Sequence, residues 1–146
     1  MKVLFVCTGN LCRSAAAEKL LALKEVPGVV VRSRGVAAQP YGGMPRQVKD
    51  FLIKAGVKEP GHKAQFIAEA DVDWADLILV MENGHFDALA ERFPQGGRKT
   101  HLFVEYCTGK EGAQLKDPMG LTDKVFEEIL GMVQACVKEL ARKLGA

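Results

Sequence analysis

The sequence lacks an apolar run long enough to cross a membrane, and it lacks a dominant charge. No hydrophobic stretch approaches the roughly 20 residues of a membrane-spanning helix. The apolar run 3–6 is also far shorter than the hydrophobic core of a signal peptide. The 20 Lys and Arg nearly balance the 18 Asp and Glu, which leaves a formal net charge of +2. The basic residues are scattered along the chain rather than clustered. We therefore expect a cytoplasmic protein that binds neither membrane nor nucleic acid, and we predict that it is a monomer.

Cysteine is sparse, and its placement argues against several kinds of site. The chain has four cysteines, Cys7, Cys12, Cys107 and Cys136. In a reducing cytoplasm all four are expected to stay free thiols, with Cys107 and Cys136 packed in the core. Cys7 and Cys12 lack the close spacing and the partners of a metal site, so no metal is predicted. No nucleotide-binding Gly-Lys-Ser/Thr loop is present either, and we expect no cofactor.

The chain does contain an alternation of strand and helix patterns. Its 146 residues, of which 48% are hydrophobic, suit a single domain spanning 1–146. Short apolar runs are predicted to be strands, and runs with apolar residues three or four apart are predicted to be helices. The expected strands are 2–6, 29–32, 75–81 and 100–104, and the expected helices are 14–24, 46–55, 86–93 and 122–144. This order predicts an α/β fold, a single-domain open four-stranded parallel sheet with helices on both faces, Rossmann-like in layout.

The segment between the first strand and the first helix has the composition of an anion site. In open α/β sheets, ligands bind beyond the carboxyl ends of the strands. A strand-to-helix junction there offers unpaired backbone N–H groups and the positive end of the helix dipole. Gly9 and Asn10 tolerate the left-handed conformations that let a tight loop curl around one anion, and Arg13 adds a planar fork for two phosphate oxygens. The residues predicted to bind phosphate are Thr8, Gly9, Asn10, Leu11, Cys12 and Arg13.

Cys7 stands at the floor of this loop and is the candidate nucleophile. Surrounded by so many donors, it is expected to be a thiolate aligned for in-line attack on phosphorus. Ser14 can donate a hydrogen bond to that thiolate and cap the following helix. A lone cysteine at a strand end is usually a small core hydrophobe. The glycine, the asparagine and an arginine six positions on favour catalysis instead.

The stretch 6–14 resembles the signature of the low-molecular-weight protein tyrosine phosphatases, which is a cysteine, five residues and an arginine near the N-terminus. The resemblance continues at 33–35, 62–64, 75–81 and 117–118, and so covers essentially the whole chain. It implies the fold of that family, a cysteine-dependent phosphatase with a cysteinyl-phosphate intermediate, and a phosphorylated protein as substrate. Ala15 departs from the family, which usually has proline there. Alanine suits a first helical turn, so we expect little loss of function.

Asp117 is the general acid that the resemblance implies. Taken alone, Asp117-Pro118 in the loop 112–120 indicates only a turn. The proline does restrict the residue before it, which fixes the direction of the Asp117 carboxyl group. The family places its acid in an Asp-Pro just before the last helix. The same carboxylate is then expected to activate water in the second step.

Two further residues are predicted to support the loop. The resemblance implies that His62 holds Asn10. Cys12 lies near Cys7 in any curled loop, and we expect that it can trap Cys7 as a reversible disulfide under peroxide.

The sequence leaves two alternatives for the phosphorylated side chain of the substrate, one for each of two branches of the family. Leu11 suits the wall of a cleft for an aromatic ring, and Tyr41 and Met44 are candidate rim residues. The bacterial protein-arginine phosphatase branch has threonine at the Leu11 position, which favours a phosphoguanidinium. Other segments resemble that branch, namely 81–85, 103–109 and 117–120. We predict phosphotyrosine, with phosphoarginine as the alternative, because the residue touching the substrate weighs more than its background.

Two other functions fit the pattern less well. A thioredoxin-coupled arsenate reductase needs a further pair of cysteines to relay a disulfide, and the chain has no cysteine between Arg13 and Tyr106. A non-catalytic phosphopeptide reader is expected to have lost Cys7, Arg13 or Asp117, and all three are present.

Overall fold

The four strands form one parallel sheet. The computed structural model describes residues 1–39 and 41–145. The strands are β1 (Lys2–Cys7), β2 (Val30–Gly35), β3 (Leu77–Val80) and β4 (Thr100–Leu102), in the spatial order β2-β1-β3-β4 with every pairing parallel. The sheet therefore changes its winding direction between β1 and β3, which is where an open α/β sheet binds its ligand.

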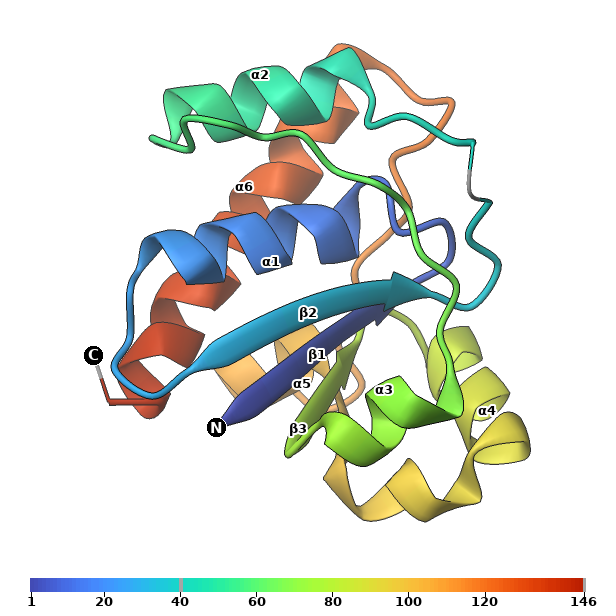
Figure 1. Cartoon of the computed structure of the whole chain (residues 1–146). Coiled ribbons are helices and arrows are strands. Elements are labelled where there is room, and N and C mark those ends of the chain that lie inside the picture. Colours follow the sequence, from blue (N-terminus) through green and yellow to red (C-terminus); the bar gives the residue numbers. More distant parts are fainter. Residues whose placement is uncertain (40, 146) are drawn as a thin grey trace.

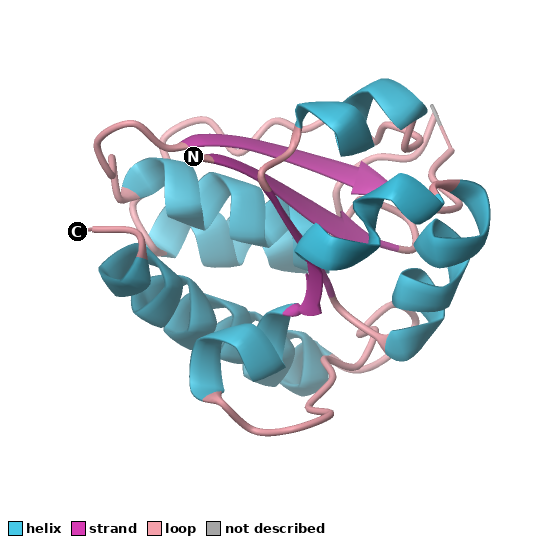
Figure 2. Ribbon diagram, turned by 90° about the horizontal axis from the view of Figure 1, so that it is seen from below, coloured by secondary structure: helices cyan, strands magenta, loops and turns pink. Residues whose placement is uncertain are grey.

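Helices cover both faces of the sheet, as the sequence predicted. One face is covered by α1 (Arg13–Leu23), α2 (Arg46–Lys54), α5 (Phe103–Thr108) and α6 (Asp123–Lys143), and the other by α3 (Glu69–Trp74), α4 (Asn83–Arg92) and the 3-10 helix η1 (Pro94–Lys99). Figure 1 shows α1, α2 and α6 above the sheet with α3 and α4 below it, and Figure 2 shows the strands between the two layers.

The strand β1 is buried on both sides because its side chains alternate between two cores. Val3 and Phe5 pack in the larger core with α1 and α6, whereas Leu4 and Val6 pack in the smaller one with α3 and α4. This is why β1 is a continuous apolar run rather than an alternating one. It places Cys7, the last residue of β1, at the centre of the carboxyl edge.

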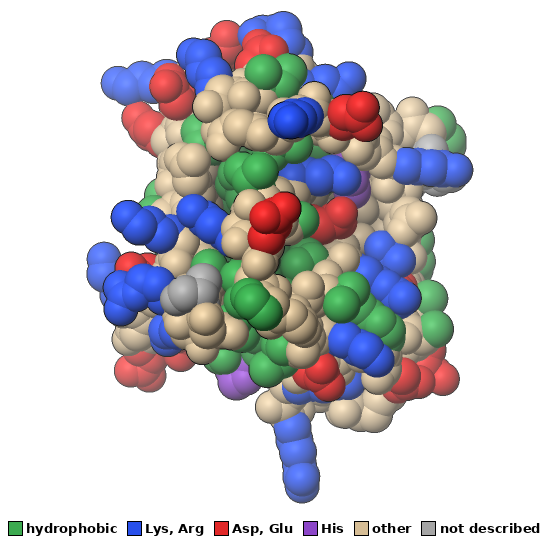
Figure 3. Space-filling view, turned by 60° about the vertical axis from the view of Figure 1, so that its left-hand side comes forward, with side chains coloured by type: hydrophobic (Ala, Val, Ile, Leu, Met, Phe, Trp, Pro, Cys, Tyr) green, Lys and Arg blue, Asp and Glu red, His purple; other side chains and the backbone are tan. Residues whose placement is uncertain are grey.

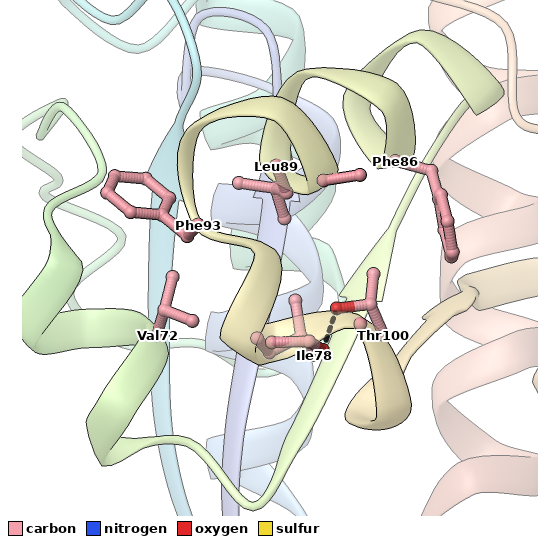
Figure 4. A pocket seen from close by; sticks show the side chains of 9 residues that line it. Val72, Ile78, Phe86, Leu89, Phe93 and Thr100 are labelled. Carbon is pink, nitrogen blue, oxygen red and sulfur yellow. Dashed lines mark hydrogen bonds between the residues drawn. The ribbon is translucent and has the colours of Figure 1, made fainter.

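The second core contains a small apolar pocket beneath α4 (Figure 4). Its walls come from α3, β3, α4, η1 and the start of β4. The hydroxyl group of Thr100 donates to the backbone oxygen of Gly96 at 2.8 Å. That polar group is thus satisfied within the wall, and the pocket is a packing feature of this core.

The structure corrects one predicted strand and adds helices that the sequence did not predict. The predicted strand 100–104 ends at Leu102, and Phe103 begins α5. The ring of Phe103 is fully buried and meets Phe5 edge to face at 5.3 Å, so packing decides the local conformation. The helices α3 and α5 have six residues each, which is too short for a helical periodicity to be visible. The other elements lie within a few residues of their predicted ranges.

The surface carries a mixture of charges. On the face in Figure 3, Lys and Arg side chains are interspersed with Asp and Glu. Among the described residues, no helix combines the length and the apolar character that crossing a bilayer requires.

Candidate active site

The loop that joins β1 to α1 forms the floor of a pocket at the carboxyl edge of the sheet. The pocket is lined by Cys7, Thr8, Gly9, Leu11, Cys12, Arg13, Asp117 and Met119. The helix α1 begins at Arg13, so the unpaired N–H groups of its first turn lie beside this loop. Residues from the start of the chain and from the loop before α6 are thus brought together, as the sequence predicted.

Asn10 holds the middle of the loop from within the protein. Its backbone is left-handed, with φ of 56°, and its side chain is fully buried. The amide nitrogen donates to the hydroxyl groups of Ser14 and Ser33, each at 2.9 Å. The amide oxygen accepts from the backbone N–H of Gln65 at 3.0 Å and lies 3.2 Å from Nε2 of His62. The predicted contact of His62 with Asn10 is therefore present.

The same bonds fix which way the hydroxyl group of Ser14 points. Its oxygen accepts from Asn10, and it lies 2.9 Å from the sulfur of Cys7. Because the lone pairs face the amide, the hydroxyl hydrogen of Ser14 is free to point at Cys7. Ser33 completes the chain by donating to the carboxylate of Glu18. The bonds therefore branch at the Asn10 amide, with one branch running through Ser14 to the sulfur of Cys7 and the other through Ser33 to Glu18.

Arg13 is anchored at one of its nitrogens. It is 1% exposed, and its Nη1 donates to Glu82 Oε2 at 2.5 Å and to the backbone oxygen of Leu115 at 2.7 Å. Both hydrogens of Nη1 are thereby used. The Nη2 atom lies 3.7 Å from Oδ2 of Asp117. The edge formed by Nε and Nη2 is thus the one that can hold an oxyanion.

Asp117 reaches the pocket on a loop that is tied to the sheet. The backbone N–H of Leu115 donates to the oxygen of Met81, just after β3, at 2.9 Å. The carboxyl group of Asp117 accepts from the N–H of Met119 at 3.0 Å. Its side chain remains 43% exposed, so the carboxyl group is open to the pocket and to solvent.

Thr8 is held by a histidine from the next strand-to-helix junction. The hydroxyl oxygen of Thr8 lies 2.8 Å from Nε2 of His85. The ring of His85 is 4% exposed. Burial, with a smaller contribution from the charge of Arg13, lowers the pKa of His85 to about 4. The imidazole is therefore neutral near pH 7.

Cys12 lines the same pocket as Cys7. Its thiol donates to the sulfur of Met119 at 3.2 Å. Burial, followed by the nearby Cys7 and Asp117, raises the pKa of Cys12 to about 12. Cys12 is therefore a neutral thiol near pH 7. The four cysteines are free and buried, and contact with Cys136, together with burial, raises the pKa of Cys107.

Several details of the prediction are wrong. Ser14 does not cap α1, because Cys12 occupies the cap position and no side chain bonds there. Gly9 is not in a left-handed conformation, so the turn depends on Asn10 alone. Met44 is 6% exposed and packs in the core, whereas Tyr41 is 84% exposed. Met44 is therefore not a rim residue, and Tyr41 is not among the residues that line the pocket.

Sequence reasoning missed the partners that come from other strands. Glu82 and His85 follow β3, and Ser33 lies in β2. The segments that contain them contribute only to the family resemblance, and no local pattern marks them as partners of Arg13, Thr8 or Asn10. The signal that could have found them is the order of the strands, since β2 and β3 flank β1. Among the described residues, no group of three or more His, Cys, Asp and Glu is arranged to hold a metal ion.

Gly35 lets β2 approach the loop, which leads to a stability prediction. A Cβ on Gly35 would lie 2.6 Å from the backbone oxygen of Thr8 and 3.0 Å from the nitrogen of Asn10. The Gly35→Ala variant is therefore expected to lose about 1–3 kcal/mol of unfolding free energy and to lose activity with it, because backbone must move. Denaturant unfolding measures this. The matched Gly131→Ala variant, in open space within α6, is expected to gain about 0.5–1 kcal/mol. Equal stability of both variants would contradict the crowding at Gly35.

Comparison with known proteins gives consistent matches over the whole chain. The family model described as low molecular weight phosphotyrosine protein phosphatase matches residues 2–146. A protein-arginine-phosphatase of Geobacillus stearothermophilus is 36% identical over 143 residues, covering 98% of this chain and 95% of the relative. The low molecular weight protein-tyrosine-phosphatase Etp of Escherichia coli K12 is 34% identical over 142 residues, covering 97% and 93%.

Solved structures of phosphatases match the fold of this chain over nearly its whole length. The YwlE arginine phosphatase from Geobacillus stearothermophilus superimposes with a TM-score of 0.92 at 34% identity, covering 98% of this chain and 92% of that one. The low molecular weight protein tyrosine phosphatase from T. tengcongensis superimposes with a TM-score of 0.88 at 31% identity, covering 98% and 99%.

Proposed function

Because the chain belongs to the low molecular weight phosphotyrosine protein phosphatase family, we propose that it hydrolyses phosphotyrosine in proteins through a phosphorylated Cys7. Membership makes it a cysteine-dependent phosphatase whose substrates are phosphorylated proteins. The single observation that carries the proposal is one pocket lined by Cys7, Arg13 and Asp117. These three side chains are the nucleophile, the oxyanion holder and the proton donor that phosphate transfer to a thiol requires.

The first step transfers the phosphoryl group to sulfur. The thiolate of Cys7, facing the hydroxyl group of Ser14 at 2.9 Å, attacks phosphorus as the bond to the tyrosine oxygen breaks. The loop N–H groups and the Nε–Nη2 edge of Arg13 hold the phosphoryl oxygens as charge shifts among them. Asp117 gives its proton to the departing oxygen. The products are tyrosine and phosphocysteine, with Asp117 left as a carboxylate.

The second step restores the enzyme. Asp117, now a carboxylate, takes a proton from water as the water oxygen attacks phosphorus. The sulfur–phosphorus bond breaks, inorganic phosphate leaves and the Cys7 thiolate returns. The exposure of the Asp117 side chain, 43%, supports this role because water must reach it.

The pocket walls favour an aromatic ring. Leu11 and Met119 are the apolar side chains that line the pocket together with Cys7 and Arg13. Leu11 is half-buried and Met119 is 47% exposed. Apolar walls around a phosphate site suit the ring of phosphotyrosine, whereas a phosphoguanidinium needs polar partners beyond its phosphate.

Phosphoarginine remains the second candidate, because a protein-arginine-phosphatase is 36% identical to this chain. Hydrolysis of a phosphotyrosine peptide and a phosphoarginine peptide by one preparation separates the two. We expect the phosphotyrosine peptide to be preferred, with no turnover of either by Cys7→Ser. A large preference for phosphoarginine would overturn the substrate assignment.

Leu11 is expected to set that preference. The Leu11→Thr variant removes an apolar wall and adds a hydroxyl group, so the ratio of kcat/KM for phosphotyrosine over phosphoarginine is expected to fall about 10-fold. The measurement is the same pair of peptides. A ratio unchanged from that of the parent protein would show that Leu11 does not select the substrate.

We further propose that the protein acts as a cytoplasmic monomer. A reducing compartment keeps a nucleophilic thiol such as Cys7 usable. Cys7, Arg13 and Asp117 of one chain line the same pocket, so the proposed chemistry calls for no residue from a second copy. The mixed charges on the face in Figure 3 support proteins rather than nucleic acid or anionic membrane as partners.

A further inference from the structure

The contact between Thr8 and His85 joins residues 77 positions apart. Thr8 follows β1, and His85 lies in the first turn of α4, shortly after β3. Because β1 and β3 are neighbours in the sheet, their carboxyl ends meet, and the two side chains reach each other across the point where the winding direction changes. Neither residue belongs to the proton transfers proposed above.

The bonds of His85 settle where its proton lies. The backbone N–H of Glu82 donates to Nδ1 of the ring at 3.1 Å, so Nδ1 carries no hydrogen. A neutral imidazole must then carry its hydrogen on Nε2. Nε2 lies 2.8 Å from the oxygen of Thr8, and His85 is therefore the donor in this bond.

This bond completes a set of three anchors on the phosphate loop. The middle of the loop is held through Asn10, and its far end through Arg13, which bonds Glu82 and Leu115. The near end begins at Thr8, whose side chain is exposed on the pocket wall. The bond to His85 is what orients that side chain.

We propose that His85 is a positioning residue for the phosphatase reaction, holding Thr8 and the first turn of the loop in the shape that receives phosphate. The inference rests on the proposed function and deepens it. A β-branched side chain has few rotamers, so one bond at its oxygen fixes the whole residue. A loop ordered beforehand does not have to be ordered when phosphate binds, and phosphate therefore binds more tightly.

Two substitutions of His85 separate this role from a purely structural one. His85 also accepts the N–H of Glu82 at the start of α4, which caps that helix. Asparagine places its side-chain oxygen near the position of Nδ1, so His85→Asn keeps the bond that caps α4 and loses the hydrogen bond to Thr8. Glutamine places its side-chain nitrogen near the position of Nε2, so His85→Gln keeps the hydrogen bond to Thr8 and loses the bond that caps α4. Thr8→Val removes the acceptor at nearly constant shape.

The measurements are kcat/KM for a phosphotyrosine peptide, the inhibition constant of inorganic phosphate and the melting temperature of each variant. His85→Asn and Thr8→Val are each expected to weaken phosphate binding and lower kcat/KM by about 3- to 10-fold. The double variant is expected to be no worse than either single one. His85→Gln is expected to stay near the parent protein in phosphate binding, although its melting temperature falls.

The reverse order, with His85→Asn like the parent protein and His85→Gln impaired, would overturn the proposal and leave His85 as a helix cap. Additive losses in the double variant would also overturn it, since the two residues would then act separately. A parent protein that bound phosphate without hydrolysing the peptide would contradict the proposed function instead. Even then, the affinities of the His85 variants for inorganic phosphate would show whether His85 positions the loop.

Discussion

Cys7→Ser is expected to lower the turnover of phosphotyrosine by about 10⁴-fold or more, which is the size of loss seen when an enzyme's nucleophile is removed. A serine hydroxyl is neutral near pH 7 and is a far weaker nucleophile than a thiolate. The substitution changes one atom of a buried side chain that already bonds Ser14 at 2.9 Å. The fold and the phosphate loop should therefore survive, and the lost property should be the chemical step.

Steady-state kinetics and phosphate binding together check this prediction. Cys7→Ser should keep the melting temperature of the parent protein and should still bind inorganic phosphate, since the loop donors and Arg13 are unchanged. A variant that hydrolysed the peptide at a rate comparable to the parent protein would remove Cys7 from the mechanism. A variant that failed to bind phosphate would instead show that the serine disturbs the loop.

Asp117→Asn is expected to lower kcat by about 10²- to 10⁴-fold for phosphotyrosine, because an amide cannot deliver a proton to the leaving oxygen. The amide oxygen can still accept from the N–H of Met119, as the carboxylate does at 3.0 Å, so the loop should keep its shape. The loss should depend on the leaving group. An aryl phosphate whose phenol is already acidic needs no proton, and its first step should be nearly unaffected.

A series of aryl phosphates with phenols of different acidity measures this dependence. The kcat/KM of the variant, which reports only the first step, should fall steeply as the phenol becomes less acidic, whereas the kcat/KM of the parent protein should change little. The control is Glu111→Gln, which makes the same carboxyl-to-amide change at an exposed residue close to the same loop and is expected to behave like the parent protein. Parallel slopes for Asp117→Asn and the parent protein would place the proton donor elsewhere.

The parts of the site that the sequence predicted are those encoded within a short stretch of chain. Cys7 and Arg13 stand in one loop between a strand and a helix, and this junction together with Gly9, Asn10 and Arg13 indicates an anion site. Asp117 needed the family resemblance, because an Asp-Pro pair by itself is only a turn. The sheet and the helices over it followed from apolar periodicity in long segments.

The parts that the sequence did not predict depend on which strands become neighbours. Glu82 bonds Arg13 across 69 positions and His85 bonds Thr8 across 77, and both bonds exist because β3 pairs with β1. No local pattern encodes that pairing. The helix α5 was missed for a related reason, since burial of Phe103 against Phe5 decides its conformation.

The most direct test of the central claim is to look for phosphate on Cys7 during turnover. The parent protein is mixed rapidly with a phosphotyrosine peptide, quenched in acid within the first turnover and digested. The mass of the proteolytic peptide that contains Cys7 is then measured by mass spectrometry. The mass of one phosphoryl group is expected on that peptide, located at Cys7 by fragmentation. Its accumulation should rise in Asp117→Asn when an activated aryl phosphate is used, because that variant cannot activate water. Single-turnover hydrolysis with no phosphoryl group at Cys7, or with the group on another residue, would contradict the account.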